Sequence, residues 1–352
     1  MHALFRKIIL VGLVIIGFSS CNQEQKTDKP VETQEFEPTA SLSKSRYNLG
    51  DSVAIHFDQP VAKLDIQMVG LDLLIKTASD STVIVPKKAN VGWQQLVVRG
   101  VRKDNSSFAD TIRIELLSDV VPTEIIYTKQ ATYPHLKSSF TEGLEFYKNE
   151  LYEGTGENGK SQLLKLDLNT GKALKSVNLD QKYFGEGITI VHDKIYQLTW
   201  QSGVCFRYNM DFSLDKTFNY YFQGWGLTHN DTTLMMSDGS NKIHFFNTEF
   251  EKTGDLQVYD NNGPVTKLNE LEYVNGFIYA NVFESTRIVK IDATTGKVVA
   301  FMNMDKIVPA EVDVRKDVLN GIAFNPEDKL LYVTGKNWPV MYSVKIKDTT
   351  IF

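Results

Sequence analysis

Five related segments recur along the last two thirds of the chain, and this repetition constrains the fold more than any other feature. Each segment is followed by a short polar turn and a second strand-like stretch, then by a third. The segments read FTEGLEF, FGEGITI, GWGLTH, LNELEY and LNGIAF and begin at Phe140, Phe184, Gly224, Leu268 and Leu319. Their starts are 44, 40, 44 and 51 residues apart. Units of this length with four strands each are typical of propeller blades, so residues 122–352 are predicted to form a five-bladed β-propeller.

The fifth unit ends with only three strand-like stretches, whereas the first four units have a fourth. The segment Glu124–Gln130 (EIIYTKQ) precedes the first unit and has strand-forming residues. We therefore expect it to supply the missing outer strand, because joining the two ends of the repeat region leaves no exposed sheet edge.

The region before the repeats divides into three parts. Residues 1–21 carry Arg6 and Lys7, a short apolar run and then Ser-Ser-Cys, a pattern that resembles a bacterial lipoprotein signal in which Cys21 is lipidated. Residues 22–36 are polar and are predicted to be a flexible tether. Residues 37–119 contain short alternating runs without a helical period, which indicate an all-β, immunoglobulin-like sandwich. These features predict a protein of the bacterial cell envelope, anchored to a membrane by lipid on its periplasmic or outer-membrane face.

Composition excludes several classes of function. The formal net charge of -5 and the absence of a basic block argue against nucleic-acid binding. The six histidines show no metal-ligand spacing, and HExxH, CxxC and GxSxG motifs are missing, so we expect neither a metal site nor a cofactor. The second cysteine, Cys205, lies in an alternating apolar stretch and is predicted to be a buried, inert thiol.

Equivalent positions of propeller blades are neighbours in space, so the repeat itself identifies candidate site residues. At the starts of the inner strands and at the ends of the second strands, the sequence places aromatic, acidic and amide side chains, one threonine and one lysine. At the starts of the inner strands these are Phe140, Glu142, Phe184, Glu186, Trp225, Asn269, Glu270 and Asn320, and at the ends of the second strands Thr155, Trp200, Asp238, Phe283 and Lys336. Carboxyl groups gathered at one channel mouth raise each other's pKa, which suits proton transfer near neutral pH. Aromatic residues at repeat positions also fill propeller cores, so packing alone is the competing interpretation.

These same residues carry a resemblance to the plant and bacterial (type I) glutaminyl-peptide cyclotransferases. It covers about Tyr127 to Lys347 through the motifs FTEGL, FGEGI, LTW, GWGL, SDGS, LNELE, VLNGIA and VTGKNWP. The resemblance implies a five-bladed propeller that converts the N-terminal glutamine of peptides or proteins to pyroglutamate and releases ammonia without a metal. Two positions depart from the family, which usually has Gln in place of Glu142 and Trp in place of Phe283.

Carried over to matching positions, the resemblance makes Glu186 the main proton-transfer group, with Lys336 and Asn269 as polar partners that stabilise the oxyanion. Phe140, Glu142, Phe184, Trp200, Trp225 and Phe283 would bind the substrate. Two alternatives stay open at this point. One is a non-enzymatic binding module at the envelope, and the other is a calcium-dependent lactonase-like hydrolase that uses Glu142, Glu186, Asn269 and Asn320 as ligands.

Overall fold

The structure of the chain is a computed structural model that describes residues 39–69, 73–77, 82–85 and 87–347. These residues form strands β1 to β29 and one short 3-10 helix, η1 (Asp305–Ile307), so the prediction of an all-β fold is confirmed. Within this described part, no helix has the length and apolar character needed to cross a membrane. The predicted lipoprotein signal (1–21) and tether (22–36) lie outside the described residues.

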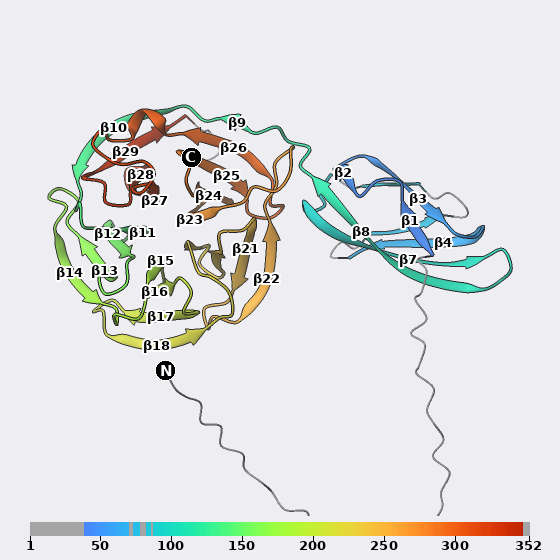
Figure 1. Cartoon of the computed structure of the whole chain (residues 1–352), viewed down its shortest axis with the longest axis horizontal. Helices are drawn as coiled ribbons and strands as arrows, with labels where there is room; N and C mark the ends of the chain where they lie inside the picture. The colour runs from blue at the N-terminus through green and yellow to red at the C-terminus, as the bar shows by residue number, and fades with distance from the viewer. Residues whose placement is uncertain (1–38, 70–72, 78–81, 86, 348–352) are drawn as a thin grey trace, which may run out of the picture. The chain divides into compact units, whose positions relative to one another are not determined.

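Five sheets follow one another along the chain after residue 122 and surround a common centre (Figure 1). The first contains β11 (Thr141–Tyr147), β12 (Glu150–Thr155), β13 (Gln162–Leu166) and β14 (Ala173–Asn178). The second contains β15 (Gly185–Val191), β16 (Lys194–Thr199), β17 (Val204–Asn209) and β18 (Leu214–Asn219). The third contains β19 (Leu227–His229), β20 (Leu234–Ser237), β21 (Lys242–Phe246) and β22 (Lys252–Gln257).

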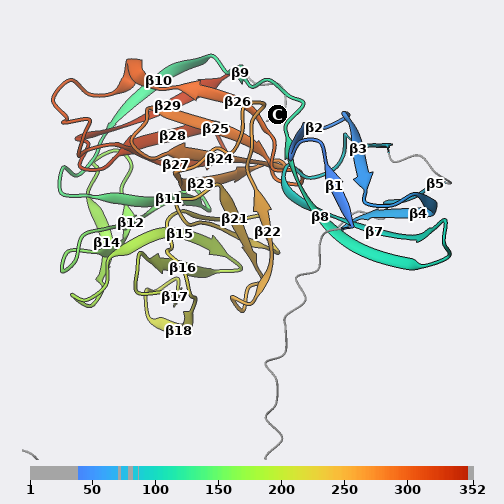
Figure 2. The same cartoon turned by 45° about the vertical axis from the view of Figure 1, so that its right-hand side comes forward.

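The fourth sheet contains β23 (Leu268–Val274), β24 (Phe277–Val282), β25 (Arg287–Asp292), β26 (Val298–Asn303) and the short β9 (Thr123–Glu124). The fifth contains β27 (Leu319–Asn325), β28 (Leu330–Gly335), β29 (Val340–Ile346) and β10 (Tyr127–Pro134). The first strand of each repeat is innermost, and each inner strand contacts the next until β27 contacts β11 again. Figure 2 shows the same succession of sheets from a second direction.

The segment before the first repeat supplies the outer strand of the fifth sheet, as predicted, but the strand begins and ends later in the sequence than expected. It is β10, which pairs antiparallel with β29 and runs to Pro134, whereas Glu124–Gln130 was expected. Thr123 and Glu124 instead pair in parallel with β26 of the fourth sheet. The chain passes from one sheet to the next at Ile125, whose side chain is buried in the core while its amide donates to the Phe301 carbonyl. Burial of this one side chain therefore determines where the closing strand begins.

Buried acidic side chains tie the inner strands together. The carboxyl group of Glu270 on β23 accepts hydrogen bonds from the amides of Leu144 on β11 (3.2 Å) and Ile322 on β27 (2.8 Å). Glu272 accepts from the Phe324 amide at 2.7 Å. An innermost strand has a sheet partner on one side only, so without these acceptors its buried amides would each cost about 1–3 kcal/mol. Some acidic residues of the repeat thus stabilise the fold, in addition to any role that others have in a site.

Glycine in the repeat permits close approach between neighbouring inner strands. A Cβ added to Gly143 would lie 2.4 Å from the amide nitrogen of Ile188, and one added to Gly187 would lie 2.5 Å from that of Leu227. Both obstacles are backbone atoms of the next inner strand, which cannot move aside as a flexible side chain would. The glycine that follows the acidic residue in FTEGL and FGEGI is therefore required by the spacing of the strands.

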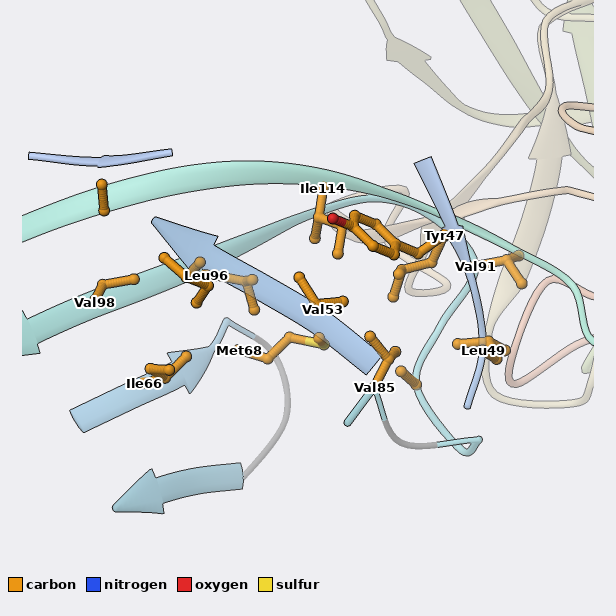
Figure 3. Close-up of a cluster of buried hydrophobic side chains, with 14 of the residues drawn as sticks. Tyr47, Leu49, Val53, Ile66, Met68, Val85, Val91, Leu96, Val98 and Ile114 are labelled. Atoms are coloured by element: carbon orange, nitrogen blue, oxygen red, sulfur yellow. The ribbon is translucent and has the colours of Figure 1, made fainter. Parts of the chain in front are cut away.

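Residues 39–117 form two further sheets. One contains β1 (Ala40–Leu42), β3 (Ser52–Phe57) and β6 (Thr82–Ile84). The other contains β2 (Arg46–Asn48), β8 (Ser107–Leu117), β7 (Gly92–Arg102), β4 (Val61–Met68) and β5 (Leu73–Thr77). Along β4, buried Leu64, Ile66 and Met68 alternate with exposed polar residues, as expected for a strand with one face in a core. Figure 3 shows Ile66 and Met68 near Val53 and Leu96 in that core.

The close approach at Gly187 gives a stability prediction. Gly187→Ala should lower the free energy of unfolding by about 1–3 kcal/mol, because the added methyl group overlaps the Leu227 backbone. The control is Gly254→Ala on the outer strand β22, where the nearest atom to an added Cβ is 3.8 Å away. Thermal unfolding followed by circular dichroism measures both. Equal melting temperatures for the two variants would contradict the close-approach argument.

Candidate active site

Nine of the thirteen residues selected from the repeat, those assigned a catalytic or binding role, line one cavity of about 300 Å³, whereas Thr155, Asp238, Glu270 and Asn320 are not part of its lining. The nine reach it from equivalent places at the same end of the five sheets. Glu142 and Glu186 are the second residues of β11 and β15, and Asn269 is the second residue of β23. Lys336 follows the last residue of β28 directly. The volume is at the lower end of the roughly 300–1,000 Å³ that is usual for small-molecule sites, so the cavity suits a ligand of one or two residues.

Glu142 is the centre of a buried polar network. One of its carboxylate oxygens accepts from the Lys336 Nζ at 2.7 Å, and the other accepts from the Asn320 Nδ2 at 3.1 Å. Asn320 also donates to the Thr141 carbonyl at 2.9 Å, which fixes its amide. Glu142 is 1% exposed and Lys336 is 6% exposed, so water hardly screens the ion pair between them. The pair is therefore held rigidly at the base of the cavity.

Two aromatic rings complete the surroundings of the lysine. The Nζ of Lys336 lies 4.6 Å from the ring centre of Phe140 and 5.4 Å from that of Phe283. The negative faces of aromatic rings attract an ammonium group at these distances. Phe283, where the resembled family usually has Trp, therefore still provides a ring for this contact.

Glu186 lies beside this pair and has no cation of its own. Burial raises the pKa of Glu186 well above its ordinary value, and the neighbouring charge of Glu142 raises it further. Burial also raises the pKa of Glu142, but the attraction of Lys336 opposes that shift. Lys336 therefore favours the ionised form of Glu142, and the pKa of Glu186 is raised more than that of Glu142. A carboxyl group with a raised pKa is suited to general acid–base chemistry.

Aromatic side chains form the walls of the cavity. Phe184 packs edge-to-face against Phe140 at 6.0 Å and against Trp200 at 5.7 Å, measured between ring centres. Trp225 makes the same type of contact with Phe283 at 5.4 Å. These walls limit the access of water, which strengthens every electrostatic interaction inside the cavity.

Gln223 orients both indoles, and the sequence analysis did not select it. Its Oε1 accepts from the Nε1 of Trp200 at 2.8 Å and from the Nε1 of Trp225 at 3.0 Å. Gln223 directly precedes the GWGL motif, and this position was the only feature of the sequence that could have identified it. Gln223 is a positioning residue, because it acts through the two tryptophans.

Asn269 has an acceptor without a partner. Its side chain is 2% exposed, and its Oδ1 makes no hydrogen bond with any residue in the described part of the chain. A buried oxygen without a donor costs free energy, so this position invites a ligand N–H group. The sequence analysis assigned Asn269 the role of a donor to an oxyanion, and that role remains a prediction.

Glu270, which stands next to Asn269 in the motif, points elsewhere. It binds the backbone amides described above, and burial raises its pKa well above the ordinary value, with the charge of Glu272 as a further cause. Asp238, at an equivalent strand end, accepts from His244 at 3.0 Å and does not line the cavity. The repeat thus identified the correct strand ends. It did not show which side chains at those ends point into the cavity, because adjacent residues on an inner strand contact different groups.

Three residues that line the cavity were not selected from the sequence: Arg315, Lys316 and Val318. They belong to the segment between β26 and β27, where the repeat spacing is 51 residues and the other spacings are 40–44. The longer spacing could have indicated these residues, because a segment inserted before an inner strand lies at the same end of the sheet as the site. Among the described residues, no group of three or more His, Cys, Asp or Glu side chains is arranged to hold a metal ion.

The thiol of Cys205 is fully buried, as predicted, and burial raises its pKa well above the ordinary value. A nucleophilic cysteine would need the opposite, a lowered pKa and access to a substrate. The chemistry of this site therefore depends on Glu186, Glu142 and Lys336.

The fold and the cavity together define an all-β protein with a buried acid–base site inside an aromatic pocket. The family model described as glutamine cyclotransferase matches residues 106–346. A glutaminyl-peptide cyclotransferase of Arabidopsis thaliana is 35% identical over 227 residues, which cover 62% of this chain and 71% of that protein. The crystal structure of Myxococcus xanthus glutaminyl cyclase matches with a TM-score of 0.61 and 33% identity, over 64% of this chain and 98% of that one. The chain belongs to the glutamine cyclotransferase family.

Proposed function

We propose that this protein is a glutaminyl-peptide cyclotransferase, which converts an N-terminal glutamine of a peptide or protein to pyroglutamate and releases ammonia. One observation carries the proposal: Glu186, with its raised pKa, stands beside the Glu142–Lys336 pair in an aromatic cavity of about 300 Å³. Membership of the glutamine cyclotransferase family supports it independently. The non-enzymatic binding module is disfavoured, because a platform for binding does not need a buried acid next to an ion pair.

The reaction requires the substrate α-amine to attack its own side-chain amide carbon. The raised pKa of Glu186 makes its carboxylate a stronger base than an ordinary one, so it can remove a proton from the α-ammonium group. The unpaired Oδ1 of Asn269 accepts a hydrogen bond from a substrate nitrogen. The aromatic walls hold the glutamine in its compact conformer, which makes the attack an intramolecular step with a favourable entropy.

The attack forms the bond between the α-nitrogen and the amide carbon and places negative charge on the amide oxygen. Lys336 supplies the positive charge that stabilises this oxyanion, and its fixed position means that little reorganisation is needed. Glu186 then donates its proton to the amide nitrogen, the bond between carbon and that nitrogen breaks, and ammonia leaves. The oxyanion re-forms the carbonyl as the bond breaks. The ring nitrogen then gives its second N–H proton to Glu186, which passes it to the departing ammonia, so ammonium is released and the Glu186 carboxylate is restored.

We further propose that the reaction is independent of metal. Calcium binds six to eight oxygen ligands, and the four residues of the lactonase-like alternative would have to supply them. Both oxygens of Glu142 are already engaged by Lys336 and Asn320, and the lysine ammonium would repel a divalent cation. This donor set suits an ion pair better than a calcium ion.

We infer that the five sheets are the blades of a five-bladed β-propeller, that residues 122–352 are the catalytic domain and that residues 37–119 are an immunoglobulin-like sandwich. The order of the strands within the sheets and the pairing of β10 with β29 support the propeller. The two facing sheets around the core of Figure 3 support the sandwich. We also propose that residues 1–21 are a lipoprotein signal, that residues 22–36 are a tether and that Cys21 carries the lipid at the cell envelope.

The first test replaces the acid–base group. Glu186→Gln should lower kcat for ammonia release from a glutamine-initiated peptide by about 100- to 10,000-fold, because the variant can neither take nor donate the proton. Glu327→Gln, the same change at an exposed turn, is the matched control and should retain full activity. A coupled ammonia assay, run with and without EDTA, measures both. Near-normal turnover by Glu186→Gln would refute its role, and loss of wild-type activity in EDTA would refute metal independence.

The second test uses the pH profile. Glu142→Gln removes a negative charge next to Glu186 and frees the Lys336 ammonium, and both changes lower the pKa of Glu186. The acidic limb of the kcat/KM profile should therefore move to lower pH, while the alkaline limb stays in place. An acidic limb that stays fixed, or that moves to higher pH, would show that Glu142 does not control the acid–base group.

The third test concerns the anchor. Cys21→Ala should abolish incorporation of an alkyne-labelled fatty acid in bacterial cells and should move the protein from the membrane fraction to the soluble fraction. Cys205→Ala removes the other cysteine of the chain and should leave labelling unchanged. Labelling that persists in Cys21→Ala would contradict lipidation at this position.

A further inference from the structure

A loop with two cations borders the opening of the cavity. Arg315 and Lys316 line the cavity, and both are exposed, so they lie where it meets solvent. They belong to the long connection between β26 and β27. None of the roles described above uses them.

The base of this loop is fixed to the segment that carries Lys336. Asp317, which follows Lys316 directly, accepts from the Asn337 Nδ2 at 3.0 Å, and its carbonyl accepts from the Trp338 Nε1 at 2.7 Å. The Lys336 amide donates to the Val318 carbonyl at 2.9 Å. Trp338 is fully buried, so these bonds hold the two cations at a constant place relative to Lys336.

The two side chains of this loop that line the cavity are both cationic, while the acidic side chains beside them, Asp313 and Asp317, are not among the residues that line it. Lys316 forms no ion pair with any residue that the structure describes, whereas Arg315 pairs with Asp313 at 3.1 Å in an 86% exposed position. An exposed pair of this kind is weak and exchanges readily with water or a ligand. Inside the cavity, Lys336 pairs with Glu142 at 2.7 Å. The charge of Glu142 is therefore already balanced by a buried cation and does not offset the loop cations.

The reaction itself determines which part of a substrate meets these cations. Only the first residue reacts, so its α-amine and side-chain amide must enter the cavity while the rest of the peptide leaves through the opening. Extended residues advance by about 3.3–3.6 Å each, so the second and third side chains pass the border of the opening. Lysine and arginine side chains are long enough to contact them there.

Resting on the proposed function, we propose that Arg315 and Lys316 determine substrate specificity: the enzyme prefers peptides in which Asp or Glu follows the N-terminal glutamine at the second or third position. The preference acts on capture of the peptide, because the cations lie at the opening and away from the reacting atoms. It therefore changes KM more than kcat.

The experiment compares three amidated peptides of equal length that differ at the second residue: Gln-Glu, Gln-Gln and Gln-Lys, each followed by the same neutral tail. For the wild-type protein, kcat/KM should fall by about two- to fivefold at each step from Glu to Gln to Lys, the size expected for exposed ion pairs. The three kcat/KM values should become nearly equal in the double variant R315Q/K316Q, and their order should reverse in R315E/K316E. Addition of 0.5 M NaCl should reduce the wild-type differences, because salt screens exposed charges.

The control is Lys306→Gln, which removes one positive charge from the same connection but at a residue outside the cavity lining. It should retain the wild-type order of the three peptides. Equal kcat/KM values for the three peptides in the wild-type protein would overturn the inference while leaving the proposed function intact. An unchanged order in R315E/K316E would also overturn it. Failure to cyclise any of the peptides, including Gln-Gln, would instead refute the proposed function on which the inference rests.

Discussion

Five inner strands meet around one centre, and each has a hydrogen-bonded partner on one side only. The structure satisfies their remaining buried amides with side chains of neighbouring sheets, above all Glu270 and Glu272. Small residues such as Gly143 and Gly187 let the strands approach closely enough for these bonds to form. Because an unpaired buried amide is costly, this arrangement fixes how far each strand extends toward the centre. The site carboxylates Glu142 and Glu186 and the amide of Asn269 depend on it directly, since they lie at the starts of these same strands.

Carboxyl groups have two separate uses in this arrangement, and the surroundings decide which applies. Glu270 accepts two backbone amides from different strands, so both of its oxygens serve the fold. Glu142 lies one position into its strand and meets a lysine and an asparagine at the cavity. Glu186 occupies the equivalent place in the next repeat but has no cation of its own. The two carboxyl groups therefore differ in pKa: Lys336 favours the charged form of Glu142, whereas the proposed proton-transfer role falls to Glu186.

Different residues around the cavity position the charged group, the aromatic walls and the loop at the opening. Buried contacts from Lys336 to Phe140 and Phe283 place the positive charge with little freedom to move. Gln223 orients the two tryptophans from outside, and the connection that holds Lys316 is tied to the segment of Lys336. The end of β28 and the residues that follow it thus position both Lys336 and the connection that carries Lys316. Preorganised groups of this kind need little rearrangement when charge develops.

The sequence by itself determined the all-β fold, the five repeats and nine of the twelve residues that line the cavity, because repeat positions become neighbours when similar units surround a centre. It also indicated the family through motifs whose order is specific. Only the tertiary structure decided that the closing strand is Tyr127–Pro134, since burial of Ile125 determines where the chain changes sheets. The structure likewise decided the partners of Glu142, the free acceptor of Asn269 and the place of Lys316 at the opening. These features depend on distances between segments far apart in the chain, and no local pattern encodes such distances.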